Sequence, residues 1–244
     1  MNKRVALITG GIRGIGRAIA LSLAEDGWSI AVCYRTSEKE GQETRKKIEE
    51  KGARALVVQC DVSDPKLASN FVSQIREKWG RIDALVNCAG PYHRVNILEE
   101  TVEGWHSMFD NNLHPVFYLS RAVAEGMKEH KWGRIINFSM ANADRQMAQP
   151  QLTGHYIAKV GVLILTRSLA RVLAPHGITV NAISPGFINS GSAPEEELES
   201  MRKKIPAGYV GDTVDVVSVT RFLMSEKAKY VNGANIHLSG GWGI

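Results

Sequence analysis

The sequence lacks the features that mark membrane-spanning, disulfide-stapled and metal-binding proteins. No run of about 18 apolar residues occurs in the chain, so we expect neither a membrane span nor a signal peptide. The three cysteines, Cys33, Cys60 and Cys88, lack CxxC spacing and lie in or just after apolar runs, which indicates buried free thiols. We therefore expect a cytoplasmic protein without a bound metal.

A one-sided charge is also missing. Lys and Arg total 30 against 25 Asp and Glu, a formal net charge of +5. The basic residues alternate with acids, as in residues 43–50, which is typical of a solvated helix face. Without a stripe of basic and aromatic residues we expect no nucleic-acid partner, whereas a slightly basic protein suits an anionic cofactor or substrate.

No linker rich in Pro, Gly or Ser divides the 244 residues, which are enough to bury a sizeable core. Strand patterns alternate with helix patterns, which predicts βαβ units and a parallel sheet covered on both faces. The sequence thus predicts one doubly wound α/β domain over residues 1–244. We expect strands at 4–9, 29–34, 53–59, 84–87, 134–138, 179–183 and 235–238, and helices at 15–26, 37–51, 65–79, 101–129, 152–173 and 213–225.

A glycine-rich stretch follows the first expected strand. Residues 9–16 read Thr-Gly-Gly-Ile-Arg-Gly-Ile-Gly and lead into the first expected helix. Glycines there permit a tight turn and let backbone N–H groups approach a pyrophosphate at the helix N-terminus. A plain tight turn is the alternative, but the position between a buried strand and an amphipathic helix favours dinucleotide binding.

Nearly the whole chain resembles the short-chain dehydrogenase/reductase family. The family's glycine motif, Thr-Gly-x-x-x-Gly-x-Gly, is matched at residues 9–16, and its Asn-x-Ala-Gly at residues 87–90. The resemblance implies a seven-stranded Rossmann sheet with three helices on each face, in homodimers or homotetramers. The positions it assigns to cofactor binding are Gly10, Ile12, Arg13, Gly14, Ile15, Gly16, Tyr34, Arg35, Thr36, Asp61, Val62, Asn87, Ala89, Gly90, Lys159, Pro185, Gly186 and Ile188.

The end of the second strand indicates which dinucleotide binds. NAD enzymes place an acid there to accept hydrogen bonds from the ribose hydroxyls. Here residues 33–37 contain no acid, and Arg35 and Arg13 are placed to flank a 2′-phosphate, with a hydroxyl from Thr36 or Ser37. Two surface arginines without a ligand are the alternative. We predict NADPH/NADP as the cofactor.

The catalytic motif departs from that of the family, which uses a tyrosine four residues before a lysine, together with a serine. Lys159 fits the family lysine, but His155 stands four residues before it and Tyr156 only three. One residue of shift rotates the phenol by about 100° around a helix. Ser139 takes the place of the first residue in the family's Ser-Ser pair, and Met140 that of the second, catalytic one.

Three hypotheses explain this departure, and the first keeps the tyrosine as proton donor. A local helix shift or π-bulge would return Tyr156 to the site. The substrate carbonyl would then be polarised by Ser139 or by a loop residue such as Asn142, Asp144 or Gln146.

In the second hypothesis His155 is the proton donor. An imidazole pKa near neutrality suits general acid work, although the neighbouring Lys159 cation disfavours its charged form; a helix-start histidine bound to a loop carbonyl is the plain alternative.

In the third hypothesis, carbonyl reduction is lost and the protein binds NADPH without turnover or performs other chemistry. Asn112 matches the family's proton-relay asparagine, or it simply caps or kinks its helix.

The chain resembles bacterial 3-oxoacyl-thioester reductases, which implies a small-molecule carbonyl substrate and acyl carrier protein as a candidate partner. Lys131 and His176 match the region that meets the acidic carrier. Residues 187–210 correspond to the substrate lid, with Gly and Ser followed by an acidic helix at 195–199. We predict an NADPH-dependent carbonyl reductase; pteridine and sugar reduction, and a non-catalytic NADPH sensor or binding protein, are the alternatives.

Overall fold

Seven parallel strands form the centre of the molecule, in the spatial order β3-β2-β1-β4-β5-β6-β9. The computed structural model describes residues 3–191 and 194–243. The strands are β1 (Val5–Thr9), β2 (Ser29–Tyr34), β3 (Ala55–Gln59), β4 (Ala84–Asn87), β5 (Gly133–Phe138), β6 (Ile178–Pro185) and β9 (Asn235–Leu238).

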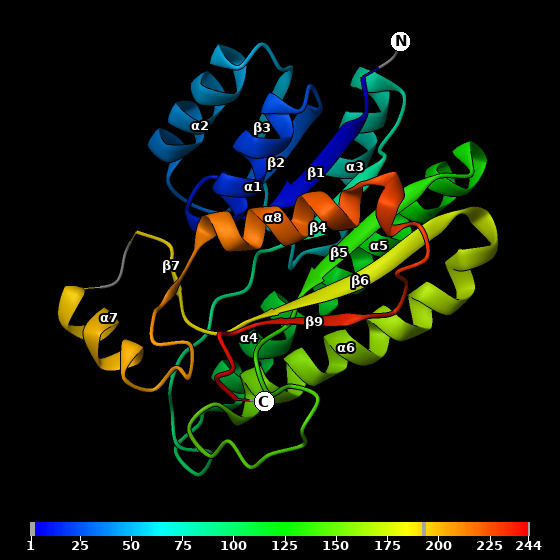
Figure 1. Cartoon of the computed structure of the whole chain (residues 1–244). Coiled ribbons are helices and arrows are strands. Elements are labelled where there is room, and N and C mark those ends of the chain that lie inside the picture. Colours follow the sequence, from blue (N-terminus) through cyan, green and yellow to red (C-terminus); the bar gives the residue numbers. More distant parts are fainter. Residues whose placement is uncertain (1–2, 192–193, 244) are drawn as a thin grey trace.

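Three helices pack on each face of this sheet (Figure 1). One face is covered by α1 (Gly14–Glu25), α2 (Glu38–Glu50) and α8 (Thr213–Met224), and the other by α3 (Pro65–Trp79), α5 (His114–His130) and α6 (Thr153–Leu173). Both the predicted single-domain doubly wound fold and its seven parallel strands are confirmed.

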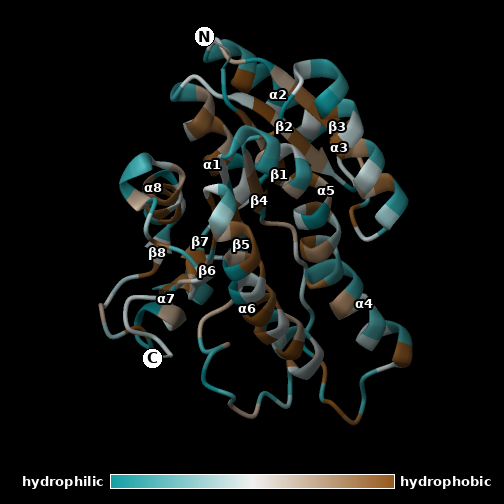
Figure 2. Cartoon of the chain, turned by 90° about the vertical axis from the view of Figure 1, so that its right-hand side faces the viewer, coloured by the Kyte–Doolittle hydropathy of each residue, from teal (hydrophilic) through white to brown (hydrophobic). Residues whose placement is uncertain are grey.

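The apolar strands explain why helices are needed on both faces. Every residue of β1, β2, β4 and β5 is buried, as expected of strands in a parallel sheet that is covered twice. Hydrophobic colour gathers on these central strands, whereas the outer turns of α2 are hydrophilic (Figure 2). α2 therefore turns Gly41, Thr44 and Ile48 to the protein interior and its charged residues to solvent.

Strand order fixes where a ligand binds. β1 pairs with β2 on one side and with β4 on the other, so the chain reverses direction across the sheet after β3. The connections that follow β1 and β4 therefore lead to helices on opposite faces of the sheet, an arrangement that forms a crevice at the carboxyl ends of the strands in open α/β folds. Ligands of open α/β sheets bind at such a switch point.

The prediction of one helix over residues 101–129 is wrong, because the structure has two. α4 (Val102–Asn112) ends at Leu113, and α5 begins at His114. Pro115 lies in the first turn of α5, and it has no N–H to donate to the carbonyl of Asn111 four residues earlier. The missing hydrogen bond interrupts the helix, so that α4 ends at Asn112 and α5 begins two residues later.

Several short elements were not predicted from the sequence. The strands β7 (Ile188–Asn189) and β8 (Gly211–Asp212) pair with each other outside the main sheet, and two short 3₁₀ turns, η1 (Ala174–His176) and η2 (Glu226–Ala228), follow α6 and α8. Two-residue strands carry too little periodicity to be recognised in a sequence. The expected acidic helix is present as α7 (Glu195–Arg202).

The cysteines are free thiols, as predicted. Cys33 and Cys60 are buried and Cys88 is half-buried. Burial raises the pKa of Cys60 to about 11 and that of Cys88 to about 12, so both are protonated and unreactive at neutral pH. Of the helices in the described part of the chain, none combines the length and apolar character needed to cross a membrane.

Candidate functional site

The loop after β1 is tied to the segment after β4. The hydroxyl oxygen of Thr9 accepts hydrogen bonds from the backbone N–H groups of Cys88 and Ala89, both at 3.0 Å. Gly10 lies so close to Ala89 that an added Cβ would come within 3.2 Å of its Cα. The two loops therefore form one floor across the switch point.

The glycine turn forms a cradle that side chains would fill. Gly10 and Gly14 have φ angles of 63° and 51°, in the left-handed region that favours glycine. A Cβ on Gly16 would lie 2.5 Å from the carbonyl oxygen of Gly10. Because no side chain caps α1 at Arg13, its first N–H groups face this cradle without a side-chain partner. The residues thus fit a pyrophosphate at the helix N-terminus.

Other predicted positions of the cradle are structural or lie at its rim. Ile12 is buried, and its carbonyl accepts a hydrogen bond from the Thr44 hydroxyl on α2, while Ile15 packs partly into the core. Arg13 is exposed at the start of α1. Tyr34 is buried, with its ring packed against Gly41 of α2.

The adenosine side of the crevice lies at the ends of β2 and β3. Arg35 and Thr36 are exposed there, and Val62 is buried. Asp61 is half-buried, and its Oδ1 accepts hydrogen bonds from the N–H of Ser63 at 3.0 Å and its hydroxyl at 2.8 Å. The absence of an acid at the end of β2 leaves Arg35 as the charged group at this position.

At the other end of the crevice, the side chains of Asn112 on α4 and Lys159 on α6 meet at Gly90. A Cβ added to Gly90 would lie 2.6 Å from Oδ1 of Asn112 and 3.0 Å from Nζ of Lys159. The Asn112 Nδ2 donates to the carbonyl of Pro91, whereas its buried Oδ1 has no partner. An orphaned acceptor beside a lysine is a costly arrangement unless a ligand or water completes it.

Lys159 is buried at this point of the crevice, with only 5% of the residue exposed. Its Nζ donates to the carbonyl of Phe138 at the end of β5, at 2.9 Å. Burial lowers the pKa of the ammonium group to about 8. The structure therefore holds a cation that loses its proton more readily than an ordinary lysine.

His155 lies one turn before Lys159 on the same buried side of α6. It is 8% exposed, its ring centroid is 5.6 Å from that of Tyr92, and its Nδ1 is buried without a partner. Burial, followed by the charge of Lys159, lowers the pKa of the imidazole to about 3. The ring is therefore neutral at pH 7.

Tyr156 is directed to the loop between β5 and α6 (residues 139–152). Its hydroxyl donates to the carbonyl of Asn142 at 2.8 Å and accepts from the N–H of Met147 at 3.0 Å. α6 is regular α-helix from Thr153 to Leu173, without the π-bulge considered above. The phenol oxygen is thus engaged twice with the β5–α6 loop.

Ser139 and the polar residues of the β5–α6 loop also have other partners. The buried Ser139 hydroxyl donates to the carbonyl of Lys159 at 2.9 Å. Asp144 accepts from Nε2 of His237 on β9 at 2.8 Å, and Gln146 is exposed. Asn142 is buried, and its Oδ1 has no partner although it lies next to Gly243.

The Asn87 side chain belongs to a buried polar chain beneath the site. Its Nδ2 donates to Oδ1 of Asn137 at 2.8 Å, and the Nδ2 of Asn137 donates to the Thr166 hydroxyl on α6 at 2.9 Å. The Oδ1 of Asn87 has no partner. These contacts fix α6, and with it Lys159, against β4 and β5.

The turn after β6 closes the far wall. The carbonyl of Pro185 accepts from the N–H of Ala141, and the N–H of Gly186 donates to Leu238 on β9. Ile188 lies in β7, and Ser190 lies against Gly14 of the cradle. Of the expected lid over residues 187–210, positions 192 and 193 lie outside the described residues.

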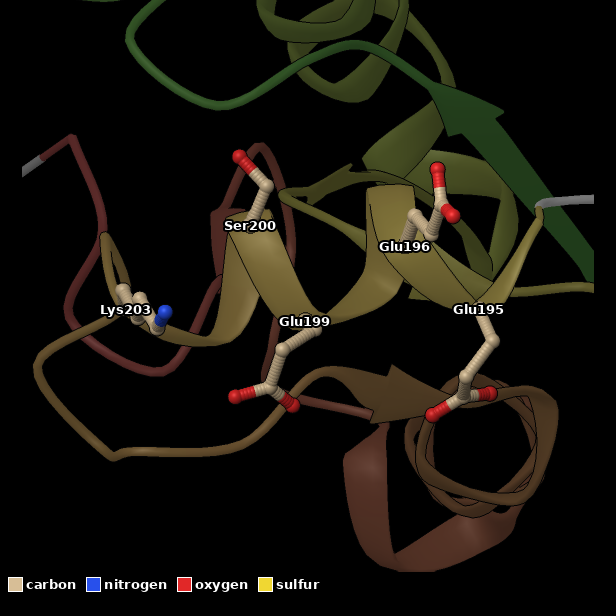
Figure 3. Close-up of a pocket in the computed structure, with 5 residues that line it drawn as sticks. All are labelled: Glu195, Glu196, Glu199, Ser200 and Lys203. Carbon is tan, nitrogen blue, oxygen red and sulfur yellow. The ribbon is translucent and has the colours of Figure 1, made fainter.

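The acidic helix α7 carries its glutamates on different sides. In Figure 3, Glu196 points away from the side to which Glu195 and Glu199 point. Glutamates in the first turn of a helix interact favourably with its dipole, so the position of these side chains is explained by a solvated helix N-terminus. Among the described residues no group of three or more His, Cys, Asp or Glu side chains is arranged to hold a metal.

Sequence reasoning missed the aromatic and acidic residues that follow Gly90. Tyr92 packs on His155, and Nε2 of His93 lies 2.6 Å from Oε2 of Glu100, whose side chain is 11% exposed. The available signal for Tyr92 and His93 was their position directly after the Asn-x-Ala-Gly motif. Asn111, which contacts Arg35, was missed as well.

Known proteins share this sequence and architecture. Residues 10–243 match the family described as Enoyl-(Acyl carrier protein) reductase. The 3-oxoacyl-[acyl-carrier-protein] reductase FabG of Staphylococcus aureus (strain Mu50) is 37% identical over 239 residues, which cover 97% of this chain and 96% of that protein.

Two solved structures resemble the fold closely. The first, of a putative short-chain alcohol dehydrogenase from Sinorhizobium meliloti 1021, has a TM-score of 0.91 at 33% identity and covers 99% of this chain and 97% of its own. The acetoin dehydrogenase YohF of Salmonella typhimurium has a TM-score of 0.90 at 30% identity, with 98% and 96% covered. Together with the cradle and the Lys159–Asn112 pair, these likenesses show that the chain belongs to the short-chain dehydrogenase/reductase family of oxidoreductases.

Proposed function

We propose that the protein is an NADPH-dependent reductase that converts a carbonyl to an alcohol, with 3-oxoacyl thioesters as the first substrate class. The observation that carries this proposal is the meeting of Lys159 Nζ and Asn112 Oδ1 at Gly90. This point lies across the switch point from an open glycine cradle. When bound, the cofactor supplies a hydride; the protein must orient the carbonyl and place a proton at its oxygen.

His155 is the residue we propose for contact with the substrate oxygen. A neutral imidazole donates an N–H hydrogen bond to an oxygen that gains negative charge, and its low pKa keeps it neutral at pH 7. Lys159, with a pKa of about 8, holds the proton that this oxygen finally requires. The engagement of the Tyr156 hydroxyl with the β5–α6 loop supports His155 over Tyr156 as the residue that contacts the substrate oxygen.

Separate substitutions of the two residues test this assignment. We expect His155→Ala to lower kcat by about 100-fold, the range of a lost general acid or oxyanion donor, with the Kd of NADPH unchanged. Tyr156→Phe keeps the ring and should retain most of kcat. A large kcat loss in Tyr156→Phe alone would restore the tyrosine as donor.

The proposed preference for NADPH depends on Arg35. No acid stands at the end of β2, and the exposed Arg35 guanidinium, with one N–H bound to Asn111, has further N–H groups for a phosphate. Arg13 at the start of α1 and Thr36, the next residue after Arg35, are the other groups we propose for this contact. We expect Arg35→Asp to invert the cofactor preference, measured as the ratio of Kd values for NADPH and NADH. An unchanged preference for NADPH in this variant would contradict the assignment.

The substrate class is proposed from the relatives and from the surface. FabG reductases are named for 3-oxoacyl-[acyl-carrier-protein]. Lys131 caps the C-terminus of α5 and His176 ends η1, and the segment over 187–210 is our candidate lid. The test is NADPH oxidation with 3-oxoacyl thioesters, ketones, diketones and pteridines. Absence of turnover on the whole panel, with NADPH binding confirmed, would favour a binding protein instead.

We also propose a homodimer or homotetramer formed through α5 and α6. Large apolar side chains stand exposed on these helices: Phe117 at 46%, Ile157 at 43% and Ile164 at 60%. Ile157 and Ile164 are seven residues apart and so share one face of α6. Sedimentation equilibrium of the wild type and of Ile164→Glu tests the proposal, because a charge on this face should yield monomers.

The proposed location is the reducing cytoplasm. The three cysteines are free thiols, which is consistent with a reducing compartment. Cys33 lies in β2, and Cys60 follows the paired strand β3. Localisation of a tagged full-length chain is the corresponding measurement, and recovery of the protein from an oxidising compartment would contradict it.

A further inference from the structure

One hydrogen bond joins the two sides of the adenosine end of the crevice. Nη1 of Arg35, just after β2, donates to Oδ1 of Asn111 near the end of α4 at 3.1 Å, although the residues are 76 positions apart. The backbone of Arg35 is held as well, since its carbonyl accepts from Nε2 of Gln59 at 3.0 Å. A long, exposed side chain thus has one defined position in the structure.

The orientation of the Asn111 amide is fixed by its own helix. Its Nδ2 donates to the carbonyl of Ser107 at 2.8 Å and lies 3.2 Å from the Ser107 hydroxyl. The amide nitrogen is therefore turned to α4, and the oxygen is turned to Arg35. A flipped amide would place its oxygen against the Ser107 carbonyl oxygen and present a donor to the guanidinium, which has no acceptor.

The neutrality of Asn111 preserves the charge of Arg35. A carboxylate at this position would hold the guanidinium equally well but would cancel its charge and compete with any anionic ligand. The nearest acid in the sequence, Asp110, is instead 2.9 Å from Nδ1 of His114, and Asp61 is bound to Ser63. Arg35 therefore keeps a full positive charge while one of its five N–H groups is occupied.

We propose that Asn111 is a specificity-determining positioning residue, which holds the Arg35 guanidinium over the adenosine end of the crevice so that its remaining N–H groups bind a 2′-phosphate. This inference rests on the proposed use of NADPH and adds the residue that fixes its recognition. Because the amide already orders the flexible arginine, less conformational entropy is lost when the phosphate binds. Asn111 acts through Arg35 and has no part in the hydride transfer.

Binding of adenosine fragments tests this role without turnover. Calorimetry on the full chain compares 2′,5′-ADP with 5′-AMP, which differ only in the 2′-phosphate. We expect Asn111→Ala to weaken 2′,5′-ADP about five- to tenfold, the worth of one hydrogen bond to a charged group, with 5′-AMP unchanged. Asn111→Asp should weaken it further, because the new carboxylate pairs with Arg35.

Two further variants separate the possible outcomes. Glu103→Ala, on the exposed first turn of α4, is the matched control and should leave both affinities unchanged. If the wild type does not prefer 2′,5′-ADP, the NADPH assignment itself fails. If Arg35→Ala removes the preference but Asn111→Ala leaves it intact or strengthens it, only the role of Asn111 is overturned.

Discussion

The hydroxyl of Tyr156 donates a hydrogen bond to the carbonyl oxygen of Asn142 at 2.8 Å. Asn142 has a φ of 71°, in the left-handed region that asparagine tolerates better than most residues, and this conformation turns its carbonyl to the tyrosine. Met147 donates to the same hydroxyl from the other end of the loop. A tyrosine one position from the family's catalytic tyrosine therefore fastens the β5–α6 loop to α6.

We predict that Tyr156→Phe lowers the free energy of unfolding by about 1–2 kcal/mol, because two backbone groups lose a partner in a largely buried site. Urea unfolding at pH 7 measures the change. Tyr230→Phe is the control, since Tyr230 is 99% exposed, and it should leave stability unaltered. Equal stability of the wild type and Tyr156→Phe would show that these hydrogen bonds contribute nothing.

We predict that Gly16→Ala weakens NADPH binding by more than about tenfold, because its Cβ would lie 2.5 Å from the Gly10 carbonyl and displace the cradle. Quenching or enhancement of NADPH fluorescence on titration gives the Kd. Gly52→Ala provides the comparison: its φ is 73°, but no atom lies within 4 Å of the added Cβ. That variant should lose stability yet bind NADPH normally, and an equal Kd for all three proteins would refute the cradle.

We predict a pH dependence of stability that belongs to His155. Its pKa is lowered from 6.5 to about 3 in the folded protein, so between these values the unfolded chain binds more protons. The resulting stability is fully present above pH 6.5 and is lost as pH falls toward 3. Relative to His155→Asn, the wild type should lose up to about 1.4 kcal/mol per pH unit in urea unfolding. Parallel curves for the two proteins would contradict the buried neutral ring.

We predict a second pH dependence, from Lys159, at alkaline pH. Its folded pKa of about 8 lies below the ordinary 10.5, so the unfolded chain binds more protons between these values. The stability of the wild type should therefore rise relative to Lys159→Met as pH increases from 8 to 10.5. Guanidinium unfolding of both proteins across this window measures the difference, and a constant difference would place the ammonium group in solvent.

Much of the architecture could be predicted from the spacing of apolar residues and glycines along the sequence. The glycine stretch after an apolar strand located the cradle, and alternating strand and helix patterns located the sheet. The break at Leu113 was less visible, because one proline two residues on is compatible with a continuous pattern. Asn111 and Glu100 gave no signal, because each contacts a neighbour that is distant in sequence or lies in a loop without periodicity.

The sequence by itself determined that the chain forms a doubly wound sheet, that a glycine-rich turn follows its first strand, and that Lys159 shares a helix with two candidate proton donors. Such features are local, since they depend on apolar period, glycine conformation and spacing along one helix. Only the tertiary structure decided that His155 is buried against Tyr92, one turn before Lys159, while the Tyr156 hydroxyl is bound to the β5–α6 loop. Adjacent helix residues point about 100° apart, and which direction faces the crevice depends on how α6 packs against strands and loops that are distant in the sequence.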